Sequence, residues 1–209
     1  ANKEQRGYIT PQEFNLFADQ AQKEIFEQYF YDLNKISKIH GEQDEYADII
    51  TNINEKISFF EQDGTITSGT INASNLYRLG TVYGSSSVIV EEVQQQEIAI
   101  INNSKLTKPT STRPVYVRVG ELSIDDYPSN SAASCTYVKT PSTPYWGYVV
   151  INGKAMWDAG ITENFEVHAS EENELVYKIL KFAGISMQRN DLATSGQSLE
   201  LSQVQQEKQ

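Results

Sequence analysis

The residue types that could bind a metal or perform catalysis are few in this chain: two histidines, His40 and His168, and one cysteine, Cys135. Two histidines near carboxylates could bind zinc or act in acid–base chemistry. Neither lies in a HExxH-like or CxxC-like motif, so we interpret both as polar residues near the ends of secondary-structure elements. Cys135 has no local signature of an activated nucleophile, and we expect it to be a small, buried core residue.

Motifs of the large enzyme classes are missing from the sequence. The chain has no G-x-S-x-G nucleophile elbow, no G-x-x-x-x-G-K phosphate loop and no G-x-G-x-x-G dinucleotide fingerprint. Its acidic residues are scattered mainly over predicted helix faces, which is typical of a solvated surface. A paired-carboxylate hydrolase needs no sequence spacing and stays open at this point, but no pattern favours it. We therefore expect a protein that is not an enzyme.

The composition disfavours several functions. Seventeen Lys and Arg residues against 28 Asp and Glu give a formal net charge of −11. A field of that sign repels phosphate backbones, so general nucleic-acid binding is disfavoured. A single cysteine excludes an intrachain disulfide framework, which favours a protein that is intracellular or assembled inside a cell. No apolar run approaches the ~18 residues that span a bilayer, and we expect no membrane association.

One stretch has the opposite charge from the rest of the chain. No Asp or Glu occurs between Glu97 and Glu121, whereas residues 1–62 contain 12 acids and 6 bases. The stretch could face DNA, could meet an acidic surface on an identical neighbouring subunit, or could be a solvated loop. Under the second hypothesis its basic residues are candidate contacts between subunits: Lys105, Lys108, Arg113 and Arg118.

Three segments have the periodicity of amphipathic helices. The Thr-Pro-Gln-Glu sequence at 10–13 is a capping box and predicts a helix over about 11–38, with an apolar stripe wide enough for more than one neighbour. A second helix is predicted over about 43–60, antiparallel to the first. Ser170 is the predicted N-cap of a third helix, which should end near Gly184.

Between these helices the pattern changes to that of strands and turns. Asp63-Gly64 and Ser68-Gly69 predict turns, and Asn152-Gly153 predicts a hairpin. A short helix is expected near 92–101, followed by a loop rich in Thr and Pro. The predicted strands cover residues 76–83, 88–91, 115–119, 122–126, 135–139, 145–152, 154–157 and 165–168.

The predicted fold class is α+β: an N-terminal helical pair, a small antiparallel β-sheet domain, and a C-terminal helix followed by an extended tail. We divide the chain into a helical region at 1–62, an α+β region at 63–188 and a polar, Gln-rich tail at 189–209. The tail has too little apolar surface to fold by itself, so we expect it to be disordered or ordered by a partner.

Aromatic residues are concentrated near the predicted hairpin. Such rings could form a platform that stacks on sugars, or they could be core residues of a small sheet, which is the commoner use. The residues concerned are Tyr137, Tyr145, Trp146, Tyr148 and Trp157.

Several segments taken together resemble a known class of proteins. The segments are 6–15, which runs into 21–34; 104–110, which leads to 113–117; and 144–148, followed by 165–172 and a Gln-rich ending. In these segments the chain resembles virion structural proteins of tailed bacteriophages, especially those of the crAss-like group and related short-tailed phages. The resemblance covers most of the chain.

The resemblance implies a head–tail connector, or neck ring protein, located in the virion and assembled in the host cytoplasm. It implies a homo-oligomeric ring, a dodecamer matching the portal, that contacts the portal and neighbouring tail proteins. Double-stranded DNA would pass through the lumen without specific binding. It implies no enzymatic activity and no cofactor. The C-terminal tail would reach an adjacent ring or subunit, and the N-terminal helices are candidates for docking.

Two other functions remain open. The chain could be another virion component, such as a capsid-associated or tail-tube protein, in which the basic stretch makes lattice contacts. It could instead be a sugar-binding or receptor-binding tail module that uses Tyr145 and Trp146.

Overall fold

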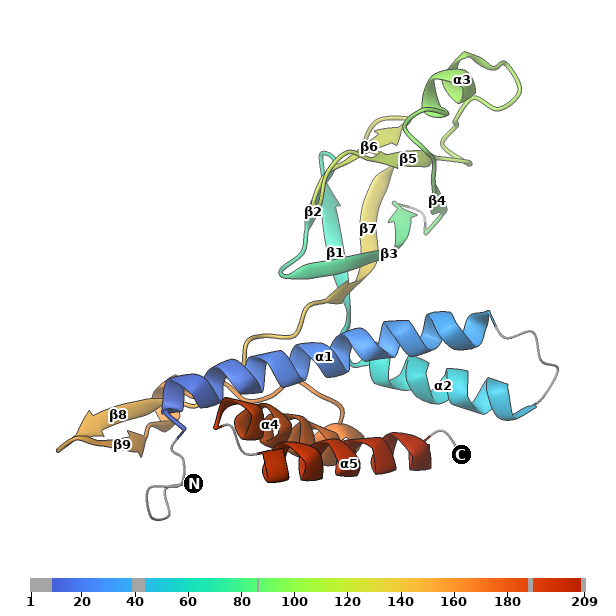
Figure 1. Ribbon diagram of the computed structural model, residues 1–209. Coiled ribbons are helices and arrows are strands. Elements are labelled where there is room, and N and C mark those ends of the chain that lie inside the picture. Colours follow the sequence, from blue (N-terminus) through green and yellow to red (C-terminus); the bar gives the residue numbers. More distant parts are fainter. Residues whose placement is uncertain (1–8, 39–43, 86, 188–189, 208–209) are drawn as a thin grey trace. The chain divides into compact units, whose positions relative to one another are not determined.

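The computed structural model describes residues 9–38, 44–85, 87–187 and 190–207 (Figure 1). The chain forms two compact units: unit 1 comprises residues 1–59 and 141–209, and unit 2 comprises residues 60–140. Helices in both halves of unit 1 and a seven-stranded mixed sheet in unit 2 confirm the predicted α+β class. The grouping differs from the predicted three-part division, because residues 141–209 pack with the N-terminal helices.

Unit 1 is mainly helical. Its helix α1 begins at the predicted capping box, where Thr10 Oγ1 accepts a hydrogen bond from Glu13 N at 3.2 Å and Glu13 Oε2 accepts one from Thr10 N at 2.8 Å. The described elements of this unit are α1 (Pro11–Ser37), α2 (Asp44–Ser58), β8 (Tyr148–Ile151), β9 (Lys154–Trp157), the short 3-10 helices η1 (Ala159–Ile161) and η2 (Ala169–Glu171), α4 (Glu172–Ser186) and α5 (Asn190–Glu207).

Helix α1 is the centre of unit 1 and contacts both α2 and α4. This confirms the expectation that its wide apolar stripe packs against more than one neighbour. The stripe is wide because two rows of apolar residues run side by side at helical spacing. The buried residues are Ala18, Ala21, Ile25, Phe26, Tyr29 and Phe30.

Two side-chain amides on α1 hold the irregular segment that follows unit 2. Asn15 Oδ1 accepts a hydrogen bond from Trp146 N at 2.8 Å. Gln22, which is fully buried, donates to Ser142 O at 2.7 Å and accepts from Glu166 N at 2.8 Å. These bonds replace the ladder bonds of a sheet. The strand predicted at 165–168 was therefore wrong, since this backbone pairs with a glutamine side chain.

The expectation of an extended tail was also wrong, because α5 is a helix that packs on α4. Buried Gly196 lets the two backbones approach closely: a Cβ atom at this position would lie 3.0 Å from Lys181 N. Glu200 also bridges from α5 to Lys178 and Lys181 on α4. The tail is thus ordered by its own chain, through contacts that its composition does not reveal.

Unit 2 is a small sheet with strand order β2-β1-β7-β3-β4-β5-β6. All neighbouring strands of this sheet pair antiparallel except β4 and β5, which are parallel, so the prediction of a purely antiparallel sheet was wrong at this pair. A parallel pair needs a long connection, and here it includes the short helix α3 (Ile98–Asn103). The strands are β1 (Glu61–Thr67), β2 (Thr70–Asn72), β3 (Leu76–Gly84), β4 (Ile89–Glu92), β5 (Val115–Arg118), β6 (Ile124–Tyr127) and β7 (Ala132–Lys139).

Hydrogen bonds between the two ends of the sheet close it into a barrel. Ile71 N donates to Leu122 O at 2.9 Å, and Ile124 N donates to Gly69 O at 2.8 Å. Closure removes the open edges at which sheets aggregate. The barrel interior is filled by the buried cluster of Ile66, Ile71, Val82, Val90, Tyr116, Ile124, Ala132 and Cys135.

The turn predicted at Asp63-Gly64 was wrong, because both residues lie within β1. Gly64 pairs with Cys135 of β7, and a Cβ atom on Gly64 would lie 3.2 Å from Cys135 Sγ and from the Tyr137 ring. Glycine is therefore used here for close packing and not for a turn. The turn at Ser68-Gly69 is confirmed, since both residues have positive φ angles, of 49° and 76°.

Candidate functional site

The basic stretch lies in unit 2, where α3 and the loop after it extend beyond the ends of β4 and β5 (Figure 1). We call residues 98–113 the tip. Ser104 Oγ accepts hydrogen bonds from Leu106 N at 3.3 Å and Thr107 N at 3.2 Å. Thr110 and Arg113 exchange backbone hydrogen bonds at 3.0 and 3.2 Å. The tip is therefore an ordered projection that local hydrogen bonds hold in shape.

The structure separates the four basic residues predicted as subunit contacts. Lys105 and Lys108 lie in the loop of the tip, and within the described residues their ammonium groups make no hydrogen bond or ion pair. Arg113 Nη2 lies 3.7 Å from Glu91 Oε2, and both side chains are so exposed that the pair is weak. Arg118 lies outside the tip and donates to the carbonyls of Gly120 and Glu121, so its guanidinium is used locally.

The tip also exposes large apolar side chains. Leu106 is 92% exposed and Ile100 is 72% exposed, and α3 contributes no buried residue to the barrel core. The charge pattern of the sequence predicted a role for the lysines of this stretch but not for Ile100 and Leu106. Exposed apolar side chains with polar residues around them are typical of a protein–protein contact.

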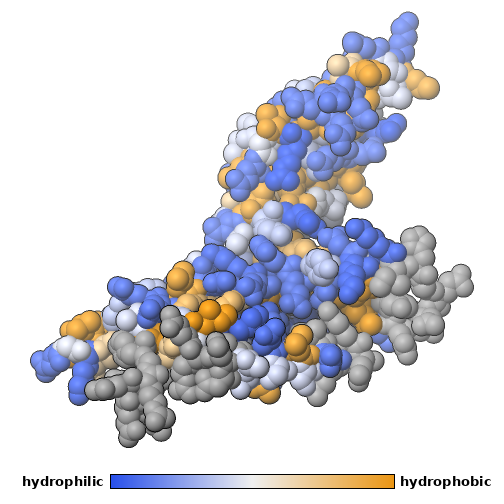
Figure 2. All heavy atoms as spheres, in the orientation of Figure 1, coloured by the Kyte–Doolittle hydropathy of each residue, from blue (hydrophilic) through white to orange (hydrophobic). Residues whose placement is uncertain are grey.

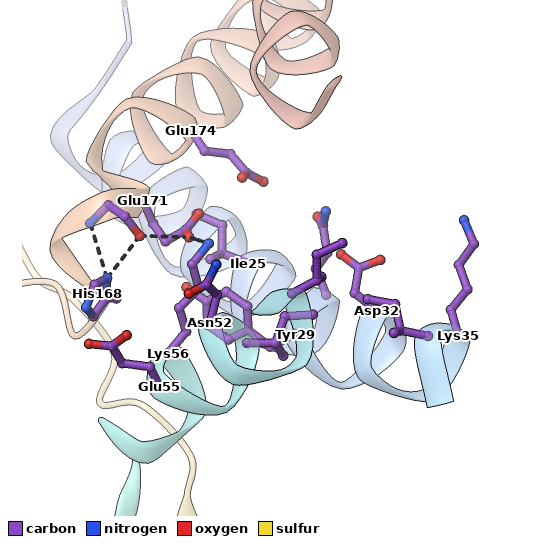
Figure 3. A pocket seen from close by; sticks show the side chains of 15 residues that line it. Ile25, Tyr29, Asp32, Lys35, Asn52, Glu55, Lys56, His168, Glu171 and Glu174 are labelled. Atoms are coloured by element: carbon purple, nitrogen blue, oxygen red, sulfur yellow. Dashed lines mark hydrogen bonds and ion pairs between the residues drawn. The ribbon is translucent and has the colours of Figure 1, made fainter. Parts of the chain in front are cut away.

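Unit 1 contains a cavity of about 530 Å³ bordered by α1, α2, η2 and the start of α4 (Figure 3). Its walls are mainly apolar, and polar side chains from α1, α2, η2 and α4 lie around them. It is lined by Ile25, Gln28, Tyr29, Asp32, Lys35, Ile36, Ile49, Asn52, Ile53, Glu55, Lys56, His168, Ser170, Glu171 and Glu174. Sequence reasoning could not find this cavity, because its walls come from segments more than 100 residues apart.

The polar end of the cavity is a connected set of side chains. Glu171 is buried and forms an ion pair with Lys56 of α2. Ser170 Oγ donates to Glu171 Oε1 at 3.2 Å and lies 2.9 Å from His168 Nδ1. His168 accepts from Ser170 N and caps η2, which confirms its interpretation as a polar residue at an element end. His40 lies outside the described residues.

Glu174 adds a second buried carboxyl group to this end of the cavity. It is 3% exposed, and its Oε1 atom lies 3.3 Å from Lys178 Nζ but has no hydrogen bond in the described structure. The pKa of Glu174 is raised to about 7, chiefly because burial disfavours the charged form; Lys178 opposes this rise and neighbouring Glu171 adds to it.

The only cysteine is not placed for chemistry. Cys135 is buried in the barrel, as predicted, and burial raises the pKa of its thiol. Among residues 9–38, 44–85, 87–187 and 190–207, no group of three or more His, Cys, Asp or Glu side chains could hold a metal ion.

The hairpin of β8 and β9 is a third unusual surface. Its turn at Asn152-Gly153 is confirmed by φ angles of 51° and 74°, although the first strand is shorter than predicted. The two strands form a separate two-stranded sheet. Its exposed large apolar residues are Val149, Val150, Ile151, Met156 and Trp157. Figure 2 shows hydrophobic surface over this hairpin and, within unit 2, at the α3 end.

The aromatic residues near the hairpin have mixed roles. Trp146 packs edge-on against Phe14 of α1 at 6.4 Å and stacks on Tyr148 at 5.8 Å, so it fixes the base of the hairpin to the helix. Tyr137 is buried in unit 2 and donates to Gln62 Oε1. Tyr145 is partly exposed and pairs through its backbone with Glu163.

Comparisons with known proteins leave the family open. No model of a protein family matches the chain, and no curated protein matches it. None of the helices in the described part of the chain is both long and apolar enough to span a membrane.

Proposed function

We propose that this protein is a non-enzymatic structural subunit that assembles into a homo-oligomeric ring in the neck of a tailed-phage virion. The ring lies next to the portal and bridges capsid and tail around the DNA channel. The observation on which the proposal mainly depends is the β8–β9 hairpin, which exposes apolar side chains that an isolated soluble subunit would bury.

The hairpin supports assembly for two physical reasons. A two-stranded hairpin is marginally stable alone in water, and this one pairs with no third strand among the described residues. Its exposed side chains include Val150, at 62%, and Trp157, at 63%. Contiguous apolar surface of this kind is typical of a protein–protein contact. A neighbouring subunit that covers the hairpin would stabilise it and order its strands.

The place in a phage neck is supported by the resemblance of the chain to virion structural proteins. The net charge of −11 agrees with it. An acidic lumen repels DNA, so a duplex passes through a ring of such subunits without binding to its wall. The function is mechanical: the ring joins two parts of the particle and keeps the DNA channel continuous.

The proposal is tested by measuring the mass of the purified protein over a range of concentrations, alone and mixed with its portal. Light scattering and native mass spectrometry should show a ring, with twelve copies expected, in at least one condition. Val150→Glu in the hairpin should abolish the ring. Val176→Glu is the matched control, because Val176 is also exposed but lies on α4.

A protein that stays monomeric at high concentration and does not bind the portal would overturn the proposal. A ring that forms equally well with Val150→Glu would show that the hairpin is not the assembly contact, and would remove the main observation behind the proposal.

A further inference from the structure

We propose that the tip of unit 2 binds the phosphate backbone of duplex DNA, with Lys105 and Lys108 as its main contacts. The inference rests on the proposed function only in the choice of DNA as the polyanion, since a ring around a DNA channel brings its subunits to the duplex. It assigns a ligand to the tip, which neither the hairpin nor the resemblance does.

The acidic residues of the protein lie mainly outside the unit that carries the tip. Residues 60–140 contain eight acids and six bases, so they contribute only −2 to the formal net charge of −11. Within them, the segment from residue 98 to residue 120 contains four bases and no acid. Charges more than ~10 Å apart are largely screened at ~0.1 M salt. The tip therefore presents positive charge although the chain as a whole is acidic.

Two positive charges of the tip are uncompensated. Lys105 and Lys108 are exposed, and among the residues that the structure describes their ammonium groups make no hydrogen bond or ion pair. Arg113 adds a third charge, which its exposed and weak pair with Glu91 at 3.7 Å compensates only in part. The two lysines can therefore bind an anion without breaking a contact in the described structure.

The composition of the loop favours phosphates over a protein surface. Eight of the ten residues from 104 to 113 are Lys, Arg, Ser or Thr, side chains that donate to phosphate oxygens in protein–DNA complexes. Lysine and serine are instead depleted at protein–protein contacts. The exposed hydroxyls of Thr107 and Ser111 make no hydrogen bond within the described part of the chain, so both are further donors.

The exposed leucine of the tip fits the same ligand. Leu106 is 92% exposed and lies between Lys105 and Lys108 in sequence. Proteins that bind the minor groove combine basic side chains with apolar ones, leucine among them, that enter between base steps. An exposed leucine also suits a protein contact, so the lysines and hydroxyls around it are what select DNA.

The tip keeps its shape without a ligand. Ser104 Oγ accepts hydrogen bonds from two backbone amides, and Thr110 and Arg113 exchange backbone hydrogen bonds. A loop that is already ordered loses little conformational entropy on binding. Phosphate contacts carry no sequence information and let a protein slide along DNA. The tip can therefore guide a passing duplex without holding it at one sequence.

Salt-dependent binding tests the inference. Fluorescence anisotropy of a labelled DNA duplex at low salt measures the affinity of the full-length protein. Lys105→Gln combined with Lys108→Gln should weaken binding at least about tenfold and lower the slope of log K against log salt concentration by about 1.8, because two phosphate contacts are lost. The matched control is Lys35→Gln combined with Lys154→Gln, which removes two exposed lysines of unit 1 and should leave the affinity unchanged.

Photo-crosslinking locates the contact on the chain. A photoreactive amino acid in place of Leu106 should crosslink to the labelled duplex. The same amino acid in place of Val176, which is exposed on α4, should not. Polyglutamate at an equal concentration of charges should fail to displace the duplex. Displacement by polyglutamate would show that the tip binds carboxylates, as on an acidic protein, and would overturn the assignment to DNA.

The outcomes separate the two proposals. Absence of DNA binding at low salt, equal affinities of the two double variants, or equal crosslinking from both positions would overturn this inference. A ring mass without DNA contact by the tip would leave the proposed function standing. A monomer that binds DNA through the tip would overturn the ring and leave the inference in place. Circular dichroism of each variant, all altered at exposed positions, checks that the chain still folds.

Discussion

The Nζ atom of Lys178 lies 2.7 Å from Oε1 of Glu200, and this contact ties α5 to α4. Lys181 donates to the second carboxylate oxygen at 3.0 Å. Lys178 is only 4% exposed, so its charge is compensated almost entirely by its own chain. A small network of ion pairs therefore helps to hold the last described helix of the protein on α4.

The first prediction concerns this network. Glu200→Gln should lower the free energy of unfolding by about 1–2 kcal/mol, since it removes two charge-assisted hydrogen bonds at a site that water partly screens. Denaturant unfolding followed by circular dichroism measures the change. Glu27→Gln on the exposed face of α1 is the matched control and should have little effect. An equal loss in both variants would contradict a special role for Glu200.

The same network predicts a dependence on pH. Burial raises the pKa of Glu200, but the hydrogen bonds from Lys178 and Lys181 outweigh it, so the pKa is lowered from 4.5. A lowered pKa in the folded state stabilises the protein above the unfolded pKa, and this contribution is lost as pH falls through the folded value. Acid titration should therefore destabilise the wild type more than Glu200→Gln below about pH 4.5.

Glu174 should contribute a pH dependence of stability with the opposite sign to that of Glu200. Its pKa in the folded state is about 7, so the folded protein binds more protons than the unfolded chain between about pH 4.5 and 7. Stability contributed by this group falls as pH rises through that window. Glu174→Gln should raise the melting temperature by a few degrees at pH 8, on a scale of ~2–4 °C per kcal/mol, and by much less at pH 5.

The control for this prediction is Glu172→Gln, because Glu172 is exposed in the first turn of α4. Its negative charge favours the helix dipole, so its loss should not raise the melting temperature. An identical shift for Glu174→Gln at both pH values would show that this carboxyl does not titrate in the expected range.

Substitution of Gln22 should destabilise the fold more than substitution of most other polar residues. Gln22→Ala leaves the carbonyl of Ser142 and the amide of Glu166 without their partner, at a cost of about 2–4 kcal/mol. Thermal unfolding should show a large drop. Gln20→Ala, two residues away on the exposed side of α1, should change stability by less than about 0.5 kcal/mol.

Gly64→Ala should destabilise the barrel. The added methyl group would meet Cys135 Sγ and the Tyr137 ring at 3.2 Å, and overpacking of this kind costs about 1–3 kcal/mol. Gly120→Ala is the matched control, because its nearest neighbour would be Ser123 at 3.8 Å, an ordinary contact. Equal stability of the two variants would contradict this prediction. It would mean that β1 and β7 can move apart to accommodate the methyl group at little cost.

The elements predicted most accurately are those whose signals are local. The capping box at Thr10 and Glu13 fixes the start of α1, and the Asn152-Gly153 dipeptide fixes the hairpin turn. Both depend on residues within four positions of one another. All the residues that determine these two features are close together in the sequence, so the pattern and the structure agree.

The predictions that failed depend on contacts between distant residues. The Asp63-Gly64 pair has the pattern of a turn, but Cys135 and Tyr137 require a glycine within β1. The polar composition of 190–207 suggests an extended chain, whereas Glu200 and Gly196 anchor it to α4 as a helix. No window of sequence includes both partners of such contacts.

The candidate surfaces also include features that the sequence predicts and features that only the fold reveals. Lys105 and Lys108 were predicted because charge can be counted along the chain. The cavity was not, because Ile25, Ile53 and Glu174 come from three segments that only the fold brings together. The exposure of Leu106 is likewise visible only once α3 is seen to bury nothing in the barrel.

The two chain segments that connect unit 2 to unit 1 lie next to each other, because the barrel begins with β1 and ends with β7 and these strands are paired. Glu61 of β1 pairs with Val138 of β7, and Lys139 N donates to Phe60 O at 2.9 Å, so both ends of residues 60–140 meet at one place. A segment with joined ends and no open sheet edge behaves as a cassette. It can be exchanged, enlarged or transplanted during evolution while the surrounding helices keep their own packing, which lets one half of the protein diversify and the other stay fixed.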